Sequence, residues 1–222
     1  MKNLFLLCAF LFTLPAVAQV PGPSVHFGIQ GDIINANLSA RVKQITGLPA
    51  SGTPFDIALE EVYGFGFGGG VHLDIDLGLI TVRVAGDYLT LTANRDKFTG
   101  PIRAAFPGSN VLYVAGGRIN IITGTVSAKL MVLPLPVFKP YITAGGGVAN
   151  VSTTAIDLNF NGNPVRPYEV LQKQTVGTIK AGVGADFSLV GLTLFAEIQV
   201  NKIFFKEGSG SFVPIGTVGL TF

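Results

Sequence analysis

The sequence predicts an all-β protein, a single eight-stranded antiparallel up-and-down transmembrane β-barrel. Three observations lead to this fold class. Charged residues make up only 13% of the chain, and the mean hydropathy is +0.53. After residue 18, no apolar run reaches the roughly 20 residues that a membrane-spanning helix needs. Eight segments instead alternate between apolar and polar side chains, and short and long connections between them also alternate.

The N-terminus has the features of a secretory signal. Lys2 precedes an apolar run over Leu4–Leu14, and Ala16-Val17-Ala18 supplies the small residues of a cleavage site. Residues 1–18 are therefore predicted to be a cleaved signal peptide, and residues 19–222 the barrel domain. Cys8, the single cysteine, lies within the signal. The mature chain would lack thiols, which excludes disulfides and cysteine-based metal or catalytic sites.

The first two strands are predicted at Val25–Leu38 and from Tyr63 to Asp76. In the second strand, odd positions are mainly apolar, and even positions are glycine followed by His72, Asp74 and Asp76. Since successive side chains of a strand point to opposite faces, one face is an apolar band. The G-x-G-x-x-G pattern at Gly64–Gly69 is therefore not read as a phosphate-binding loop, because a strand and not a helix follows it.

The even glycines of this strand are expected to face the lumen, where they would leave room for long Arg and Lys side chains of facing strands. The same alternation recurs over six further segments, which complete the eight strands: 80–88, 122–130, 139–151, 177–187, 194–201 and 212–222.

The connections predict which end of the barrel faces which side of the membrane. Those at 77–78, 133–137 and 190–191 are very short, whereas those at 39–62, 93–110 and 152–174 span roughly twenty residues; the fourth link of this second set, at 206–210, is brief. Outer-membrane barrels pair short periplasmic turns with long external loops.

The polar face is assigned to the lumen because the chain has too few charged residues to cover a solvated surface. It is predicted to form a lumen charge network in which most charges are paired, since isolated buried charges are costly. Its members are Asp32, His72, Asp74, Asp76, Arg83, Asp87, Lys129, Lys180, Asp186 and Glu197.

Four features resemble the small bacterial outer-membrane β-barrel proteins, the OmpA-, OmpX- and OmpW-like group with a porin-like barrel domain. These are the segments 27–31, 139–147, 195–197 and 218–222. The resemblance covers the mature chain and implies a Gram-negative outer-membrane protein. It implies that Val218, Leu220 and Phe222 form the barrel-assembly signal, although the usual upstream glycine is displaced. Because the chain has no Trp, it also implies that the aromatic girdles are formed by Tyr63, Tyr88, Tyr113 and Tyr141 together with some of the 17 phenylalanines.

The histidines raise two further hypotheses. His72, Asp74 and Asp76, with His26 near the same end, are plausible metal ligands. However, residues two apart on a strand lie about 6.5–7 Å apart, so paired lumen charges are the preferred interpretation, and no metal or cofactor is predicted. Enzymatic barrels of this membrane use histidine with serine or aspartate. No external histidine is available here, so no catalytic residue is assigned and the chain is predicted not to be an enzyme.

The function expected is a structural or loop-mediated interaction role, with a lumen filled by charged side chains. A narrow channel for small solutes is the first alternative, and a lipid-modifying barrel enzyme is the second. The expected partners are outer-membrane lipid, lipopolysaccharide and the barrel-insertion machinery. Arg95, Lys97 and Arg103 in one long loop are candidates for contact with lipopolysaccharide. The near-neutral charge argues against nucleic acid.

Overall fold

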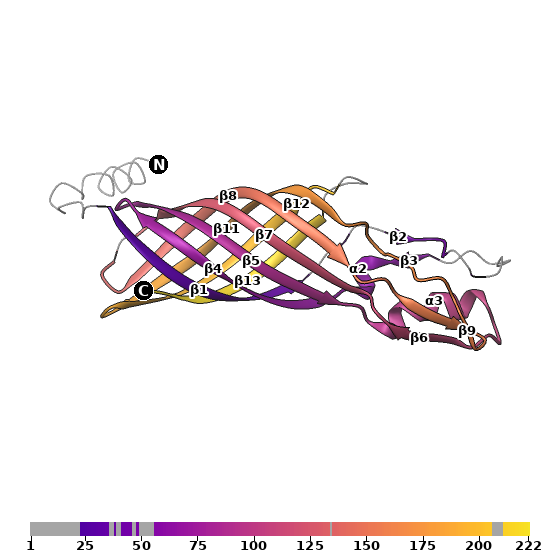
Figure 1. Cartoon of the computed structure of the whole chain (residues 1–222). Coiled ribbons are helices and arrows are strands. Elements are labelled where there is room, and N and C mark those ends of the chain that lie inside the picture. The colour runs from indigo at the N-terminus through magenta and orange to yellow at the C-terminus, as the bar shows by residue number, and fades with distance from the viewer. Residues whose placement is uncertain are drawn as a thin grey trace, which may run out of the picture.

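The computed structural model describes residues 23–35, 38, 41–45, 48, 56–133, 135–205 and 211–222. The predicted signal peptide and the link at 206–210 lie outside these ranges. Eight long strands form a closed barrel in which each strand pairs with its neighbours in sequence, and the first pairs with the last (Figure 1). They are β1 (Ser24–Asn35), β4 (Phe65–Asp76), β5 (Ile80–Thr92), β7 (Arg118–Met131), β8 (Phe138–Thr153), β11 (Gln174–Leu189), β12 (Leu192–Ile203) and β13 (Ser211–Thr221). The predicted fold class is confirmed.

The turns at one end of the barrel are as short as the sequence predicts. Between β4 and β5, a carboxylate oxygen of Asp76 accepts a hydrogen bond of 2.8 Å from the backbone N–H of Gly78. Gly78 has φ of 97° and Gly191, between β11 and β12, has φ of 76°. Only glycine adopts this left-handed conformation without a steric cost, so these residues permit two tight turns.

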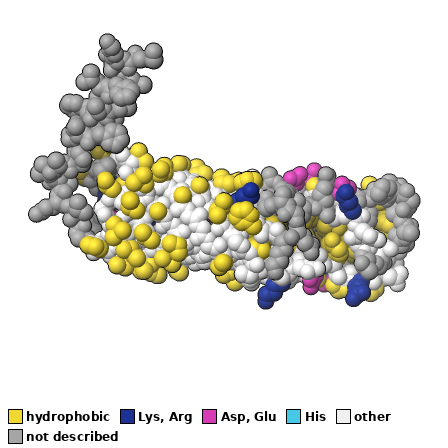
Figure 2. Space-filling view, turned by 90° about the horizontal axis from the view of Figure 1, so that it is seen from above, with side chains coloured by type: hydrophobic (Ala, Val, Ile, Leu, Met, Phe, Trp, Pro, Cys, Tyr) yellow, Lys and Arg dark blue, Asp and Glu magenta, His cyan; other side chains and the backbone are white. Residues whose placement is uncertain are grey.

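The outer wall of the barrel is an apolar belt. Exposed side chains on it include Phe67, Val71, Ile142, Val183, Ile198 and Val218. Figure 2 shows hydrophobic side chains spread over the barrel half of the molecule, whereas Lys, Arg, Asp and Glu side chains gather on the other half. On the outward faces of the described barrel strands, just two side chains are Lys, Arg, Asp or Glu: Arg118 and Lys202. Both lie near the end of the barrel opposite the short turns.

At that end, the long connections fold into a cap (Figure 1). Its helices are α2 (Leu59–Val62) and α3 (Arg95–Ala105). Its strands are β2 (Arg41–Val42) and β3 (Ile57–Ala58), which form a pair, and β6 (Val111–Ala115), β9 (Asp157–Phe160) and β10 (Asn163–Pro164), which form a small sheet. No helix in the described part of the chain is long and apolar enough to cross a membrane.

The structure corrects the prediction of a long loop over residues 93–110. It contains α3, and the connection continues through β6 until β7 begins at Arg118. Asn94 caps the helix, because its side chain accepts a hydrogen bond of 3.1 Å from the backbone N–H of Lys97. Phe98, Ile102 and Ala105 are buried at helical spacing. This i, i+4, i+7 pattern was readable in the sequence and predicts an amphipathic helix.

Candidate functional site

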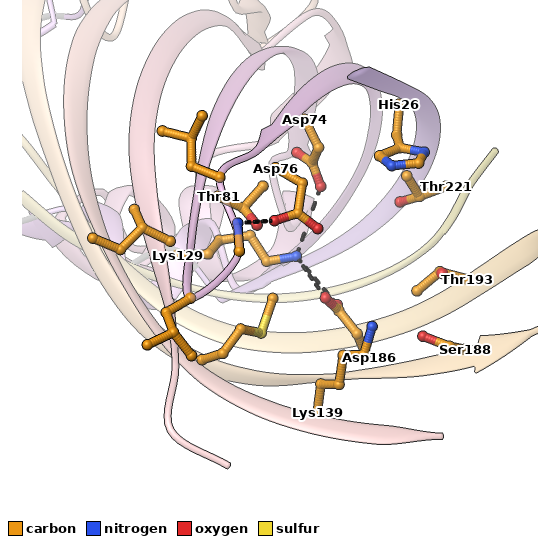
Figure 3. Close-up of a pocket in the computed structure, with 15 residues that line it drawn as sticks. His26, Asp74, Asp76, Thr81, Lys129, Lys139, Asp186, Ser188, Thr193 and Thr221 are labelled. Atoms are coloured by element: carbon orange, nitrogen blue, oxygen red, sulfur yellow. Dashed lines mark hydrogen bonds and ion pairs between the residues drawn. The ribbon is translucent and has the colours of Figure 1, made fainter. Parts of the chain in front are cut away.

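The barrel lumen opens at the short-turn end into a vestibule with a cavity volume of about 670 Å³. Polar residues line much of it, including His26, Asp76, Lys139 and Ser188. In Figure 3, the ammonium group of Lys129 points between Asp74 and Asp186. The vestibule is therefore bounded on its inner side by buried ion pairs.

The first layer of the closed lumen is a set of ion pairs around Arg83 and Lys129. Arg83 donates two hydrogen bonds to Asp74, of 2.7 and 2.8 Å, and lies 4.0 Å from Glu197. Lys129 lies 3.0 Å from Asp186 and 3.7 Å from Asp74. Because β4, β5, β7, β11 and β12 contribute these residues, the layer connects strands around the barrel.

Tyr141 belongs to this layer and not to an outer girdle, which corrects the expectation for this residue. It is buried, and its hydroxyl donates a hydrogen bond of 2.9 Å to Glu197. Its ring lies 4.2 Å from the ammonium group of Lys129, which is cation–π geometry. Tyr63 is also fully buried, and Tyr113 packs within the cap. Among the four tyrosines expected in the girdles, only Tyr88 is exposed on the outer wall of the barrel.

His72 is buried in the lumen wall beside two neighbours that are not metal ligands. Its Nε2 atom lies 3.1 Å from the hydroxyl of Thr221, and its ring makes an edge contact with Phe195 at 5.2 Å between centroids. His26 instead lies at the mouth, where its Nε2 atom is 2.9 Å from the hydroxyl of Ser24. Within the described ranges, no three His, Cys, Asp or Glu side chains come together as a metal site.

A second polar layer surrounds Lys180. The hydroxyl of Thr217 donates a hydrogen bond of 2.6 Å to Asp32, and Asp87 accepts hydrogen bonds from Gln30 (2.6 Å) and Thr123 (3.0 Å). Lys180 is within electrostatic range of Glu197, Asp87 and Asp32, but makes no ion pair of 4.0 Å or less with the described residues. All ten residues predicted for the lumen charge network face the lumen. Asp74, Asp76, Lys129 and Asp186 line the vestibule, where Asp76 also caps a turn.

Lumen glycines lie beneath several of these contacts. Gly28 separates His72 from Thr221, because it pairs with both residues across β1. Gly184 separates Tyr141 from Glu197 in the same way across β11. A Cβ atom at Gly184 would lie 2.5 Å from the Tyr141 ring. A glycine in the middle strand thus lets side chains of the two flanking strands contact each other.

The expectation that the glycines of β4 accommodate Arg and Lys is wrong in detail. Gly66, Gly68 and Gly70 do face the lumen, and Gly64 lies just before the strand. Their space is taken by the side chains of the adjacent strand β5, namely Leu91, Leu89 and Asp87. Side chains of the adjacent strand fill the space above these glycines because they lie about 5 Å away, closer than the side chains of any strand across the lumen.

Towards the cap, the lumen becomes apolar, a feature that was not predicted from the sequence. Inward-facing residues there include Ile34, Leu89, Leu91, Ile119, Ile121, Val151, Val213 and Ile215. They belong to one buried apolar cluster with cap residues such as Phe98, Ile102 and Leu158. One sequence feature could have predicted this apolar layer: the alternation is lost near these strand ends. In Ile119-Asn120-Ile121-Ile122, for example, both faces carry apolar residues.

The surface of the cap is polar. Arg95, Lys97 and Arg103 of α3 are exposed. The guanidinium group of Arg103 also donates two hydrogen bonds, of 2.9 and 3.2 Å, to the carbonyl oxygen of Val111. Burial raises the pKa of Tyr113, whose ring packs on Phe98, although nearby Arg95 acts in the opposite direction. The cap is therefore a small folded unit with a cationic helix on its outside.

The residues assigned to the assembly signal lie at the end of the last strand. Val218 and Phe222 are exposed on the outer wall, and Leu220 is half-buried. The backbone N–H of Phe222 donates a hydrogen bond of 2.8 Å to the carbonyl oxygen of Phe27. Their outward orientation matches the predicted alternation; their role in assembly stays a prediction.

Comparison with known proteins finds similarity in structure and not in sequence. No family model matches the chain, and no curated protein matches it. Neisserial surface protein A has a TM-score of 0.52 at 13% identity, and the alignment covers 90% of this chain and 97% of that one. The N-terminal barrel domain of Pseudomonas aeruginosa OprF has a TM-score of 0.41 at 14% identity, covering 89% and 97%. A major outer membrane protein of Thermus thermophilus has a TM-score of 0.42 at 13% identity, covering 90% and 99%.

The first of these similarities shows the fold. This chain has the fold of that protein, a closed eight-stranded antiparallel β-barrel. Within the described residues, its lumen is layered, polar near the vestibule and apolar under a folded cap.

Proposed function

We propose that this protein is a non-enzymatic bacterial outer-membrane barrel that is closed to solutes and holds a folded cap outside the membrane. Its role would be structural or interactive, carried by the cap. The observation that supports this most directly is the single apolar core that runs from the upper lumen into the cap. A core shared in this way closes the barrel and fixes the cap on it.

The outer wall supports the membrane location. Lipid tails tolerate apolar side chains, whereas a charged residue at the middle of the bilayer costs about 2–4 kcal/mol in a barrel. The outward faces of the described barrel strands follow this rule, since Arg118 and Lys202 both lie at the cap end. Polar contacts such as Tyr88 with Asn120 (2.9 Å) and Asn150 with Thr175 (2.9 Å) lie at the same end. They would mark the outer membrane boundary.

The lumen supports a closed barrel over the alternative of a narrow channel. Eight strands enclose a space just wide enough for side chains to fill. Here the two polar layers are followed by an apolar layer with Leu89, Ile119 and Ile121, each no more than 2% exposed. An ion crossing this region would lose its hydration without gaining polar partners, which is costly.

Conductance in planar bilayers tests the closed lumen. The refolded protein should show no steady conductance. The double variant Leu89→Ala, Ile121→Ala, which widens the apolar layer, should show brief openings, whereas Val84→Ala on the outer wall should stay silent. Steady conductance of the unmodified protein would favour the channel alternative.

Cysteine labelling in intact cells tests the orientation of the cap. The predicted mature chain has no cysteine, so Lys97→Cys and Ser188→Cys would each carry a single thiol. Lys97 is exposed on α3, and Ser188 lines the vestibule. A membrane-impermeant maleimide should label Lys97→Cys in intact cells, and Ser188→Cys only after the outer membrane is permeabilised. The reverse result would place the cap in the periplasm.

Lipopolysaccharide is the proposed partner at the outer boundary. Arg95, Lys97 and Arg103 present cations on the cap. Nearer the belt, the ammonium group of Lys202 lies 5.1 Å from the Phe212 ring centre and 5.4 Å from that of Phe204. Such a cation between exposed aromatic rings suits the phosphate level of a membrane. Binding to lipopolysaccharide vesicles should weaken with salt and with the triple variant Arg95→Ala, Lys97→Ala, Arg103→Ala.

A lipid-modifying enzyme is the second candidate because Ser24 and His26 lie 2.9 Å apart at the vestibule. A nucleophile and base at this distance are one part of a hydrolytic site. Against this candidate, the described residues provide no carboxylate that accepts a hydrogen bond from His26 and would orient its ring. Cells expressing the protein or its His26→Ala variant should contain the same lipid A species. A species that disappears in the variant would support catalysis.

A further inference from the structure

Two adjoining grooves lie on the outer wall of the barrel, where β1, β13, β12 and β11 are neighbours (Figure 1). Their volumes are about 730 and 650 Å³, and they join because both are lined by Gly31, Ala196 and Val218. Exposed side chains such as Ile33 and Ile198 form part of the lining. The grooves therefore open outward, towards lipid and not towards the lumen.

Small residues form the floor of these grooves. Gly216 on β13 lies between Ile33 of β1 and Ile198 of β12, because it pairs with both residues. Gly31, two residues before Ile33, lies on the same outward face of β1. A Cβ atom added at Gly216 or at Gly31 would meet no atom within 4 Å. The space above these glycines is therefore open to a molecule from the membrane.

A cation lies above the grooves, at the cap end of the same strands. Lys202 of β12 pairs with Phe212 of β13 and with Ile179 of β11, so its neighbours on the outer wall are apolar. Its ammonium group lies 5.1 Å from the ring centre of Phe212 and 5.4 Å from that of Phe204. Among the described residues, no ion pair of 4.0 Å or less joins Lys202 to a carboxylate. These surroundings leave its charge to be balanced by an anionic group of the membrane.

The distance between Lys202 and the grooves matches the depth of one membrane leaflet. A strand rises about 3.3 Å per residue, so along β12 Ile198 lies about 13 Å and Ala196 about 20 Å from Lys202. Strands of membrane barrels tilt by about 35–45°, which reduces these distances to depths of about 10 and 15 Å. The hydrocarbon core of a bilayer is about 30 Å thick, so one leaflet occupies about 15 Å of it. A lipid with its phosphate at Lys202 would place its acyl chains over the grooves.

We propose that this part of the outer wall binds one molecule of lipid A, the phosphorylated and acylated anchor of lipopolysaccharide. Lys202 would bind a phosphate group, and acyl chains would lie over Gly216 and Ala196. Two adjoining grooves suit a lipid that carries several acyl chains. The proposal rests on the proposed orientation of the barrel, which places Lys202 in the outer leaflet. It concerns the barrel wall and does not depend on the cationic helix of the cap.

Binding of lipid A to the purified mature barrel in detergent provides the test. Native mass spectrometry counts the lipid A molecules that stay bound as lipid A is added. The heat-dependent gel shift verifies that each variant is folded. One lipid A molecule should stay bound per barrel at saturation. Lipid A without phosphate groups should bind about fivefold more weakly, which is the effect of one cation at a membrane surface.

Two variants assign the binding to the two parts of the site. Lys202→Met should weaken the binding of lipid A about fivefold and remove the preference for the phosphorylated form. Gly216→Ile fills the groove and should weaken binding about tenfold, because methylene groups of the lipid lose their contact with the wall.

Each variant has a matched control on β7, which β11 and β8 separate from β12. Arg118→Met removes the other outward-facing cation at the cap end of the barrel. Gly124→Ile adds the same side chain at an outward-facing glycine whose added Cβ atom would also meet no atom within 4 Å. Both controls should bind lipid A as the unmodified protein does.

Three results would overturn the proposal. Affinity that is unchanged in both Lys202→Met and Gly216→Ile would place the lipid elsewhere. Equal retention of phosphatidylethanolamine would contradict a site for lipid A. Binding of many lipid A molecules without saturation would mean that the grooves are covered like the rest of the wall.

The orientation on which the site rests is tested separately. Labelling of Ser188→Cys in intact cells would overturn the orientation itself. If Lys97→Cys is labelled there instead, unchanged affinity in the two wall variants would overturn the lipid A site alone.

Discussion

Gln30 on β1 donates a hydrogen bond of 2.6 Å to Asp87 on β5, across the strand that separates them. The residue between them on β4 is Gly70, which pairs with Gln30 on one side and with Asp87 on the other. The same arrangement joins His72 to Thr221 over Gly28, and Tyr141 to Glu197 over Gly184. Gly28, Gly70 and Gly184 therefore mark three places in the lumen where side chains two strands apart bind one another.

Substitution of Gly70 by alanine should destabilise the barrel by about 1–3 kcal/mol, the usual cost of overpacking a filled interior. The new methyl group would clash with the Asp87 carboxylate and with the carbonyl oxygen of Gly86. Gly31→Ala is the matched control, since Gly31 faces outward and its added methyl group would meet no atom within 4 Å. Urea unfolding in lipid vesicles measures the stability of both variants. Equal stability of the two variants would contradict the packing role of Gly70.

Replacement of Lys129 by methionine should cost about 3–5 kcal/mol of folding stability, because a buried carboxylate then loses its partner. Lys129 is 2% exposed and binds Asp186 at 3.0 Å. Lys139→Met at the vestibule should cost far less. Adding Asp186→Asn to Lys129→Met should recover part of the loss. The unfolding midpoints of the unmodified protein, the two single variants and the double variant are compared. If the double variant recovers no stability, Lys129 and Asp186 are not coupled.

Ile102→Ala should loosen the cap and leave the barrel closed. Ile102 is fully buried in the shared apolar core, so the truncation should cost about 2–5 kcal/mol of local stability. Limited proteolysis of the reconstituted protein should then cut near α3, while the heat-dependent gel shift of the barrel persists. Lys97→Ala on the exposed side of the helix serves as control. A gel shift lost in Ile102→Ala would mean that cap and barrel unfold together.

Tyr63→Phe should leave the protein as stable or more stable at neutral pH and remove part of its alkaline sensitivity. The Tyr63 hydroxyl is buried with no partner in the described structure, and burial raises its pKa above the ordinary value. The folded state therefore holds the phenol proton more tightly than the unfolded chain does. Stability from this group is complete below the ordinary tyrosine pKa of about 10 and is lost as pH rises above it.

The stability of the cap in the unmodified protein and in Tyr63→Phe is measured by proteolysis at neutral and at alkaline pH. The unmodified protein should lose more stability on the alkaline side than Tyr63→Phe does. A phenylalanine variant that is clearly weaker at neutral pH would show that the hydroxyl has a stabilising contact.

The strands were predictable because lipid and lumen place opposite demands on alternate side chains. The pairs Val183 with Gly184 and Ile198 with Gln199 show the alternation directly, one side chain facing out and the next facing in. The short turns were also predictable from spacing, with Gly78 and Gly191 at their tips. The tyrosines were assigned wrongly where identity alone was used, as at Tyr141, because an amphipathic ring fits a membrane boundary and a hydrogen-bonded interior equally well.

The alternation of side chains along each strand predicted which residues face the lumen, but it did not predict which of them bind each other. Nothing in the positions of Lys129 and Asp186, on strands separated by β8, indicates that they bind each other. The cap was missed because the 93–110 segment was assigned to a loop although Phe98 and Ile102 follow a helical period. The apolar upper lumen was missed because apolar residues on both faces of a strand end do not identify what covers them.

The sequence by itself determined the architecture of the barrel: its eight strands, the face that most of their side chains take and the end at which the short turns lie. These are local properties, set by a period of two and by chain length. Only the tertiary structure decided which lumen charges pair, which glycines make room for those pairs and how the long connections close the barrel. These depend on the shear of the closed sheet, which brings distant strands into register and cannot be read from any single segment.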